Sequence, residues 1–422
     1  MSEAAASPPA PPAHPLRALA WRLRAPLGIA LLAFVVLAAF SGHRFLRQSK
    51  APHFVWQAGA FLEGRLDLPV DPPNMEDWVR IGDRFYQSFP AMPAVVMAPF
   101  VALWGYQFND TSFTVIIAAL SLALFYLVLR RLSETGDSPR SAGENVVLTL
   151  LLGFGTLFFY MSIRGEVWFT AQIMGVGFTS LYLLAAHRAR RPLLAGVLFA
   201  MATLTRTPLM FAGIFFVAEV LSPEGSLHPH ELKRELGPKV KKLLLFGLGA
   251  LPLAAAHAAF NYARFGKLSE FGHRLLWNNR VNADIARWGL FDPHYLPRNL
   301  KAAFFSLPTV QTEPLRIGYD PHGLSLFITT PLLLLLLFPK HTGRLHRILW
   351  LTVACTALPG LFYQNTGYMQ FGFRFSLDYT PYLVLLLAIG GWSIRSRLFQ
   401  ALAVIGVAVN TWGALVFRGY SW

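Results

Sequence analysis

Residues 113–129 read FTVIIAALSLALFYLVL, an apolar run without a single charged side chain. About 17–25 such residues are enough to cross the hydrocarbon core of a bilayer as an α-helix. The chain repeats this pattern many times, most clearly at Pro26–Phe40, Phe113–Leu129, Val146–Ile163, Ala171–Ala186, Leu243–Phe260, Leu324–Phe338, Ile348–Phe362, Tyr379–Trp392 and Leu398–Phe417. Composition agrees, because 54% of the residues are hydrophobic and only 14% are charged. The sequence therefore predicts an all-α polytopic membrane protein.

The spacing of the apolar runs leaves room for one large domain. Short polar loops separate the runs over residues 21–422, which predicts a single multispanning membrane domain. Residues 1–20 begin with a segment rich in Ala, Pro and Ser, and we expect a disordered cytoplasmic tail there. The only cysteine, Cys355, lies in an apolar segment, so intramolecular disulfides and thiolate metal clusters are excluded.

The formal net charge of +15 does not indicate a nucleic-acid partner. Lys and Arg gather in the short loops that flank the apolar runs, as the positive-inside rule requires. Because no soluble basic surface is left to carry DNA or RNA, the partner that the composition predicts is the lipid bilayer.

Hydropathy and charge disagree about residues 91–106. That run is apolar enough to count as a span, but Pro93 and Pro99 break a regular helix. If it does not cross, the short basic loops all fall on the side of the N-terminus, which is then cytoplasmic. We therefore expect about 11 transmembrane helices and an interfacial or re-entrant element at 91–106. Large extracytoplasmic loops follow at about 41–111 and 264–322.

The first of these loops combines acids with aromatic rings. Its segment His53–Leu62 is apolar and aromatic enough to form an amphipathic helix on the membrane surface. Rings stack on sugar faces and carboxylates accept hydrogen bonds from hydroxyls, so Trp78 and Tyr86 beside these acids indicate sugar binding. A solvated loop with interface-anchoring aromatic residues is the alternative. The acids are Glu63, Asp67, Asp71, Glu76, Asp77 and Asp83.

Arg206 stands out because it lies between two apolar runs, in the segment Leu204–Pro208. On the expected topology it sits at the outer boundary, where a buried cation is expensive and often functional. A guanidinium binds a phosphate through two parallel hydrogen bonds, which makes Arg206 a candidate substrate-binding residue. The alternative is a loop arginine that reaches toward the interface.

Two other segments place an arginine near an acid. Arg164 and Glu166 occupy a short outer turn, either as a local salt bridge or as substrate contacts. Arg374 and Asp378 stand four residues apart, so a helix would bring them onto one face as an ion pair. Asp378 then either serves the structure alone or also orients Arg374 toward a phosphate.

Four short motifs resemble the GT-C superfamily of membrane glycosyltransferases, in particular its bacterial protein O-mannosyltransferase-like and lipid-A aminoarabinose transferase-like branch. The resemblance, together with the helix pattern, covers most of residues 20–420. The motifs that carry it are Phe61–Leu66 (FLEGRL), Ser88–Pro93 (SFPAMP), Leu204–Pro208 (LTRTP) and Phe371–Tyr379 (FGFRFSLDY).

The resemblance implies sugar transfer at the outer face of a bacterial inner membrane. The donor would be a sugar on a polyprenyl phosphate, delivered from the lipid phase, and Arg206 matches the position at which the family's basic residue meets that phosphate. The family generally places an acid early in the first outer loop as the base, but residues 48–54 here contain none. Glu63, Glu76, Asp77 or His53 would have to take that role.

The sequence thus favours an enzyme that moves a sugar from polyprenyl phosphate to an unknown extracytoplasmic acceptor. Asp77 or Glu76 would deprotonate the acceptor, and Arg206, helped by Arg374, would hold the donor phosphate. The missing early acid supports one alternative, a non-catalytic scaffold or subunit with the same fold. A transporter or lipid flippase is the other, although the spans lack deep ionisable groups. No cofactor is specified; a divalent metal is compatible with the acidic loop, but no spacing there defines a site.

Overall fold

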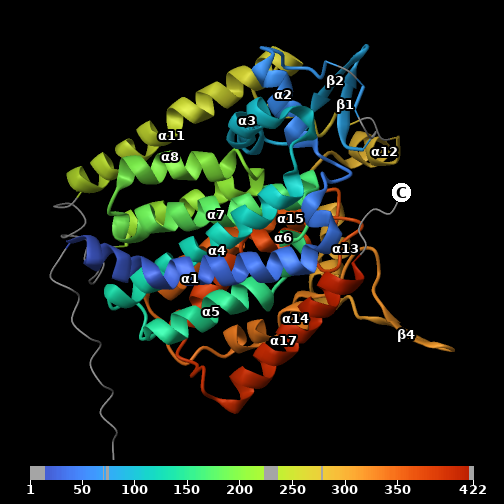
Figure 1. The fold of residues 1–422 in the computed structure, drawn as a ribbon. Helices are drawn as coiled ribbons and strands as arrows, with labels where there is room; N and C mark the ends of the chain where they lie inside the picture. The colour runs from blue at the N-terminus through green and yellow to red at the C-terminus, as the bar shows by residue number, and fades with distance from the viewer. Residues whose placement is uncertain (1–14, 70, 73–75, 223–235, 277–278, 418–422) are drawn as a thin grey trace, which may run out of the picture.

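In a computed structural model, the chain forms a bundle of helices (Figure 1). The structure describes residues 15–69, 71–72, 76–222, 236–276 and 279–417. Within these residues, six helices are long and apolar enough to cross a membrane. They comprise α1 (Pro15–Ser41), α4 (Asp110–Glu134), α7 (Val167–Ala186), α11 (Leu236–Phe265), α15 (Arg344–Phe362) and α17 (Arg397–Val416). The prediction of an all-α protein with helices that can span a membrane is confirmed, whereas the predicted number of about 11 crossings is not tested by these lengths.

Shorter helices and two small hairpins complete the described chain. The further α-helices are α2 (His53–Leu62), α3 (Met92–Trp104), α5 (Ala142–Phe154), α6 (Phe158–Ser162), α8 (Pro192–Thr203), α9 (Gly213–Leu221), α12 (Asn279–Trp288), α13 (Leu296–Leu300), α14 (Leu326–Thr329) and α16 (Thr380–Ile389). Antiparallel hairpins join β1 (Trp78–Ile81) to β2 (Arg84–Gln87) and β3 (Thr309–Thr312) to β4 (Leu315–Gly318).

Two apolar runs that looked continuous in sequence are broken. Val146–Ile163 splits into α5 and α6 around Gly155, and Thr156 turns its hydroxyl back onto the Leu152 carbonyl at 2.6 Å. The run that starts at Leu324 becomes the short helix α14 and a 3₁₀ helix η7 (Pro331–Leu337), because Pro331 cannot continue an α-helical hydrogen-bond ladder. Helix boundaries in such runs follow local breakers that a hydropathy scan does not see.

At the start of the chain, residues 15–20 belong to α1, which corrects the prediction of a tail that ends at residue 20. Pro15 occupies the first position of α1, where its missing N–H removes no helical hydrogen bond. Residues 1–14 of the predicted tail lie outside the described part of the chain.

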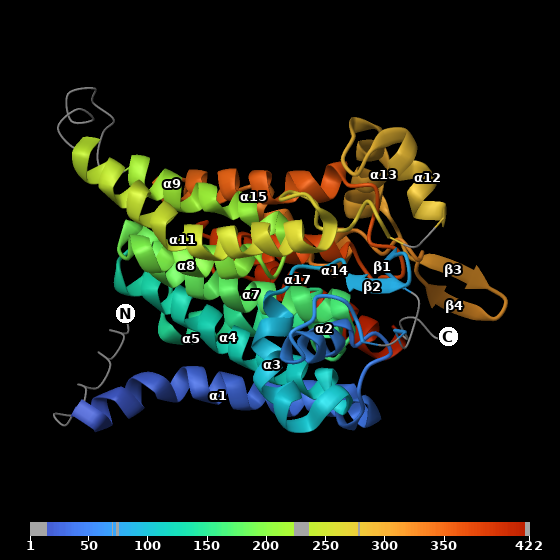
Figure 2. The ribbon, with the colours of Figure 1, turned by 90° about the horizontal axis from the view of Figure 1, so that it is seen from above.

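The two hairpins and several short helices gather at one end of the bundle (Figure 1). α1 begins at the opposite end, and α17 ends at this one (Figure 1). The elements α2, α3 and β1–β2 lie there together with α12, α13 and β3–β4 (Figure 2). The predicted helix at 53–62 is confirmed as α2, with the same bounds. α3 has only 13 residues, about 20 Å of helix, which is shorter than the roughly 30 Å hydrocarbon core.

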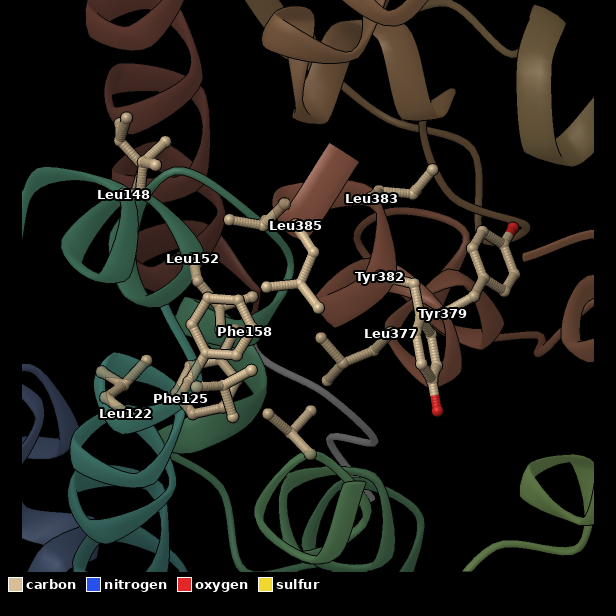
Figure 3. Packing of buried hydrophobic residues seen from close by; sticks show 14 of the residues in the cluster. Leu122, Phe125, Leu148, Leu152, Phe158, Leu377, Tyr379, Tyr382, Leu383 and Leu385 are labelled. Carbon is tan, nitrogen blue, oxygen red and sulfur yellow. The ribbon is translucent and has the colours of Figure 1, made fainter. Parts of the chain in front are cut away.

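Side chains from distant helices fill the core between α4, α5 and α16. Leu122 and Phe125 of α4, Leu148 and Leu152 of α5, and Leu385 of α16 are almost completely buried together (Figure 3). Elsewhere the backbones themselves meet, because a Cβ added at Gly196 of α8 or Gly249 of α11 would collide with the facing helix. Such close crossings of small residues are a usual way to join helices in a membrane.

Candidate functional site

A cavity of about 620 Å³ lies near the end of the bundle that carries the two hairpins, where the loops meet the helices. It is formed by the loop between α1 and α4, α7, the segment after α8, the segment after α11, the end of α15 and the residues before α16. The polar and charged residues that line it are Asp77, Gln172, Arg206, Thr207, His273, Gln364, Asn365 and Arg374. Aromatic and aliphatic side chains, among them Trp168, Phe211, Leu358 and Phe375, form the rest of the wall.

Asp77 is the one carboxylate among these lining residues, and its position is tightly held. Its backbone lies in the left-handed region, with φ at +55°, immediately before β1. The indole N–H of Trp168 donates to Asp77 Oδ2 at 2.7 Å, and the Ser88 hydroxyl donates to the Asp77 carbonyl at 3.0 Å. Burial raises the pKa of the Asp77 carboxyl, although the Trp168 hydrogen bond and the charge of Arg374 oppose that shift. Such an environment suits a general base.

Arg206 enters the cavity wall from the extended residue between α8 and the 3₁₀ helix η4 (Thr207–Ala212). Its guanidinium donates two hydrogen bonds to Asp378, from Nε to Oδ1 at 3.0 Å and from Nη2 to Oδ2 at 2.6 Å. This bidentate contact joins residues 172 positions apart and fixes the plane of the guanidinium.

The contact corrects the expected ion pair between Asp378 and Arg374. These two residues belong to a 3₁₀ helix, η8 (Arg374–Asp378), and not to an α-helix. With about three residues per turn, positions four apart point in different directions, so the two side chains do not share a face. Asp378 therefore reaches the loop arginine Arg206, and Arg374 is left to face other neighbours.

Arg374 is held through its backbone. Its N–H donates to Gln370 Oε1 at 3.0 Å, and its carbonyl accepts a hydrogen bond from Gln172 Nε2 at 2.7 Å. The side chain is 5% exposed, and its Nη1 has no hydrogen-bond partner among the described residues. A buried guanidinium nitrogen without a partner costs free energy, which an anionic ligand in the cavity would recover.

The other candidate bases lie away from the cavity wall. His53 is completely buried, stacks on Trp78 with ring centroids 4.2 Å apart, and its Nε2 contacts the Glu76 carbonyl at 2.8 Å. Burial lowers the pKa of His53 to about 4, so the ring is neutral at pH 7. Burial and the neighbouring Asp77 raise the pKa of Glu76 to about 7, but its side chain does not line the cavity. Glu63 is exposed and accepts a hydrogen bond from the Tyr106 hydroxyl.

The aromatic residues proposed to stack on a sugar are also placed elsewhere. Trp78 is 0% exposed, and the face that His53 covers is unavailable to a ligand. Tyr86 is buried against Phe265, with ring centroids 5.9 Å apart. The hairpin β1–β2 turns both rings inward, so the aromatic surface of the cavity comes instead from Trp168, Phe291 and Phe375.

Arg164 and Glu166 form the local salt bridge that the sequence allowed. Arg164 donates to Glu166 from Nε at 3.2 Å and from Nη2 at 2.7 Å, and its Nη1 donates to the Phe417 carbonyl at 3.1 Å. Burial alone would raise the pKa of Glu166, but the charge and hydrogen bonds of Arg164 outweigh it and hold that pKa below its usual value. The pair does not line the cavity.

Sequence reasoning missed several polar contributors to the site, among them Trp168, Gln172 and His273. Gln172 carried a usable signal, because a polar side chain inside an apolar helix is a candidate functional residue. Burial and the charge of Arg206 lower the pKa of His273 to about 4, so this ring is a neutral hydrogen-bonding group. Trp168 and His273 gave no signal, since only the folded chain brings them to Asp77 and Arg206.

The site combines a cationic side, a single carboxylate and an extended apolar wall. Among the residues that the structure describes, no group of three His, Cys, Asp or Glu side chains is placed to hold a metal ion. No family model matches the chain, and no curated protein matches it either.

Proposed function

We propose that the chain is a GT-C-like membrane glycosyltransferase that moves a sugar from polyprenyl phosphate to an extracytoplasmic acceptor. One observation carries the proposal: Asp77, Arg206 and Arg374 come from three distant segments and line one cavity. A candidate base and two candidate phosphate-binding groups thereby face a common space. The proposal further places the chain in a bacterial inner membrane.

The chemistry follows from the charges. Ionised Asp77 would take the proton of an acceptor hydroxyl as that oxygen attacks the anomeric carbon. The bond from that carbon to the phosphate oxygen would break, and the polyprenyl phosphate would leave with the electron pair. Arg374 and Arg206 lie where they would stabilise the negative charge on this leaving group. Attack opposite the leaving group inverts the configuration of the sugar.

The wall of the cavity fits a donor with a lipid tail. Met210, Phe211 and Leu358 line the cavity and are each more than 40% exposed on the surface of the bundle. Exposed apolar side chains on a membrane helix face lipid, so an apolar path leads from the hydrocarbon phase toward Arg206. A lipid-linked substrate would enter along this path.

The proposal includes about 11 crossings with the N-terminus in the cytoplasm. Beyond the six long helices, it assigns crossings to the apolar helices α5, α8, η4–α9 and α16 and to the apolar segment α14–η7. Support comes from α1 and α17, which begin and end at opposite ends of the bundle, as an odd number of crossings requires (Figure 1). Under this topology the cavity opens toward the extracytoplasmic side.

The test uses purified protein in lipid nanodiscs with polyprenyl-phosphate-linked sugars. Wild-type protein should bind the lipid saturably, and Arg206→Ala should abolish that binding. Asp77→Asn should retain binding but lower transfer about 10²–10⁴-fold, the usual contribution of a general base. Full transfer activity in both variants would overturn the proposal. Binding without transfer in wild-type protein would favour the scaffold alternative, and lipid translocation without transfer would favour a flippase.

A further inference from the structure

Helix α7 organises both chemical sides of the cavity. Trp168 and Gln172 stand four residues apart on this helix, which places them on one face, and both line the cavity. Trp168 donates to the Asp77 carboxylate at 2.7 Å, and Gln172 donates to the Arg374 carbonyl at 2.7 Å. The two side chains thus connect the candidate base with a candidate phosphate-binding residue through a single turn of helix.

The orientation of the Gln172 amide is fixed by its partner. The Arg374 carbonyl can only accept a hydrogen bond, so the atom that faces it must be the amide nitrogen. The oxygen Oε1 then points elsewhere and acts only as an acceptor. Gln172 is 1% exposed, and Oε1 has no partner in the described part of the chain. Buried polar atoms are nearly always hydrogen-bonded, so an unpartnered acceptor in a cavity wall points to a ligand donor.

We infer that Gln172 reads a hydroxyl group of the transferred sugar and thereby determines donor specificity. This inference rests on the proposed function. In the proposed arrangement the phosphate lies at Arg374 and the acceptor at Asp77, so the sugar ring lies between them. Gln172 donates a hydrogen bond to the backbone carbonyl of Arg374. It also lies one helical turn from Trp168, whose indole holds Asp77. In this arrangement its free acceptor would lie on the sugar's side of the cavity wall.

The kind of ligand group that fits follows from Gln172 Oε1, which can only accept a hydrogen bond. A sugar hydroxyl donates to Oε1, whereas a deoxygenated or O-acylated position cannot, and leaves the buried oxygen unpaired. A site that is built to hydrogen-bond a hydroxyl rejects an analogue without it far more strongly than an apolar pocket rejects an extra group. His273 repeats the pattern on the segment after α11, since it lines the same cavity and its Nδ1 is buried without a partner among the described residues.

The experiment separates sugar recognition from phosphate binding. Affinities of the purified protein are measured for undecaprenyl phosphate and for the same lipid carrying mannose, glucose or galactose. Wild-type protein should prefer at least one glycosylated lipid over the bare lipid. Gln172→Leu should reduce that preference about tenfold, the effect of one buried hydrogen bond. It should lower the affinity for undecaprenyl phosphate less, because it also removes the hydrogen bond to the Arg374 carbonyl.

Gln57→Leu is the matched control, because it makes the same substitution at a buried glutamine of α2 that does not line the cavity. Gln57 Oε1 is also buried without a partner among the described residues, so the two variants differ in access to the cavity and the sugar preference should persist in Gln57→Leu. If Gln172→Leu weakens bare and glycosylated lipids equally, Gln172 only positions Arg374 and the inference is overturned. If wild-type protein binds bare lipid but prefers no glycosylated form, the inference fails and lipid-phosphate binding stands. If it binds neither lipid, the proposed function fails as well.

Discussion

Among the residues that the structure describes, two largely buried, bidentate arginine–carboxylate contacts differ in what surrounds them. Arg206 and Asp378 come from segments 172 residues apart and meet beside the cavity. Arg164 and Glu166 are two residues apart in one turn, and the third Arg164 nitrogen is taken by the Phe417 carbonyl. The first pair therefore supports a wall that a ligand can reach, whereas the second has its charges and donors satisfied within the protein. Pairing and burial alone do not mark a functional arginine; access to a cavity does.

The largest expected effect separates the two pairs directly. Substituting only one residue of a pair leaves the other charge buried and uncompensated, which lowers the free energy of unfolding by about 3–5 kcal/mol. Both residues of each pair are therefore replaced by neutral ones. Arg206→Gln/Asp378→Asn should fold but lose polyprenyl-phosphate binding and at least 100-fold in transfer. Arg164→Gln/Glu166→Gln should fold and keep both. Equal loss of binding in the two double variants, measured on protein of equal thermal stability, would break the comparison.

An intermediate effect concerns the hydrogen bond between Trp168 and Asp77. This bond partly offsets the rise in the pKa of Asp77 caused by burial, so Trp168→Phe should raise that pKa further. Because the proposed base would take a proton only when it is ionised, the rising limb of the pH–rate profile should move to higher pH by about one unit.

Trp78→Phe provides the control for this shift. Trp78 is a buried indole near Asp77, but its Nε1 has no hydrogen-bond partner among the described residues. Its removal should leave the midpoint of the profile in place. A profile that Trp168→Phe does not displace would show that Asp77 is not the group that limits transfer at low pH.

The smallest effect compares Glu76 with Glu166. Burial raises the pKa of Glu76 from 4.5 to about 7, so the folded chain holds this proton more tightly than the unfolded chain does. The free energy of unfolding therefore falls as the pH rises from about 4.5 to 7. Glu76→Gln should raise the melting temperature by about 1–2 °C at pH 8 and leave it unchanged at pH 4.

Glu166→Gln should do the opposite. The pKa of Glu166 is lowered in the folded chain, so its stabilising contribution is present above the ordinary pKa of a glutamate and is lost as the pH falls. The variant should melt at a lower temperature than wild-type protein at pH 8. Thermal unfolding of both variants at the two pH values checks the signs, and shifts of the same sign at pH 8 would contradict this account.

Local patterns in the sequence predicted the parts of this molecule that local physics determines. The helix at 53–62 appeared with its expected bounds. The prediction that Pro93 and Pro99 break a regular helix was wrong, because α3 begins beside Pro93, continues through Pro99 and ends at Gly105, whose φ is +66°. Arg206, Arg374 and Asp77 were identified because each is a charged residue beside apolar or aromatic sequence. The number of crossings stays a prediction, since Pro331 and the break at Gly155 divide runs that hydropathy alone treats as whole.

Contacts between distant segments could not be predicted in the same way. Asp378 met Arg206 because residues 374–378 form a 3₁₀ helix, a choice that spacing in the sequence does not reveal. Trp78 and Tyr86 turned inward with their hairpin, whereas Trp168, which no pattern in the sequence singled out, is the partner of the candidate base. Sequence reasoning thus found the charges but not the groups that orient them.

The left-handed backbone of Asp77 restricts which amino acids residue 77 can tolerate over evolution. Beyond glycine, Asp and Asn adopt this conformation most readily, because their short polar side chains bond to nearby backbone, and longer side chains lack that compensation. Of the two acidic amino acids, only the shorter one is therefore compatible with the turn. A library randomised at this codon should recover Asp, Asn and Gly as folded protein, and Asp alone as folded protein with a carboxylate in the cavity.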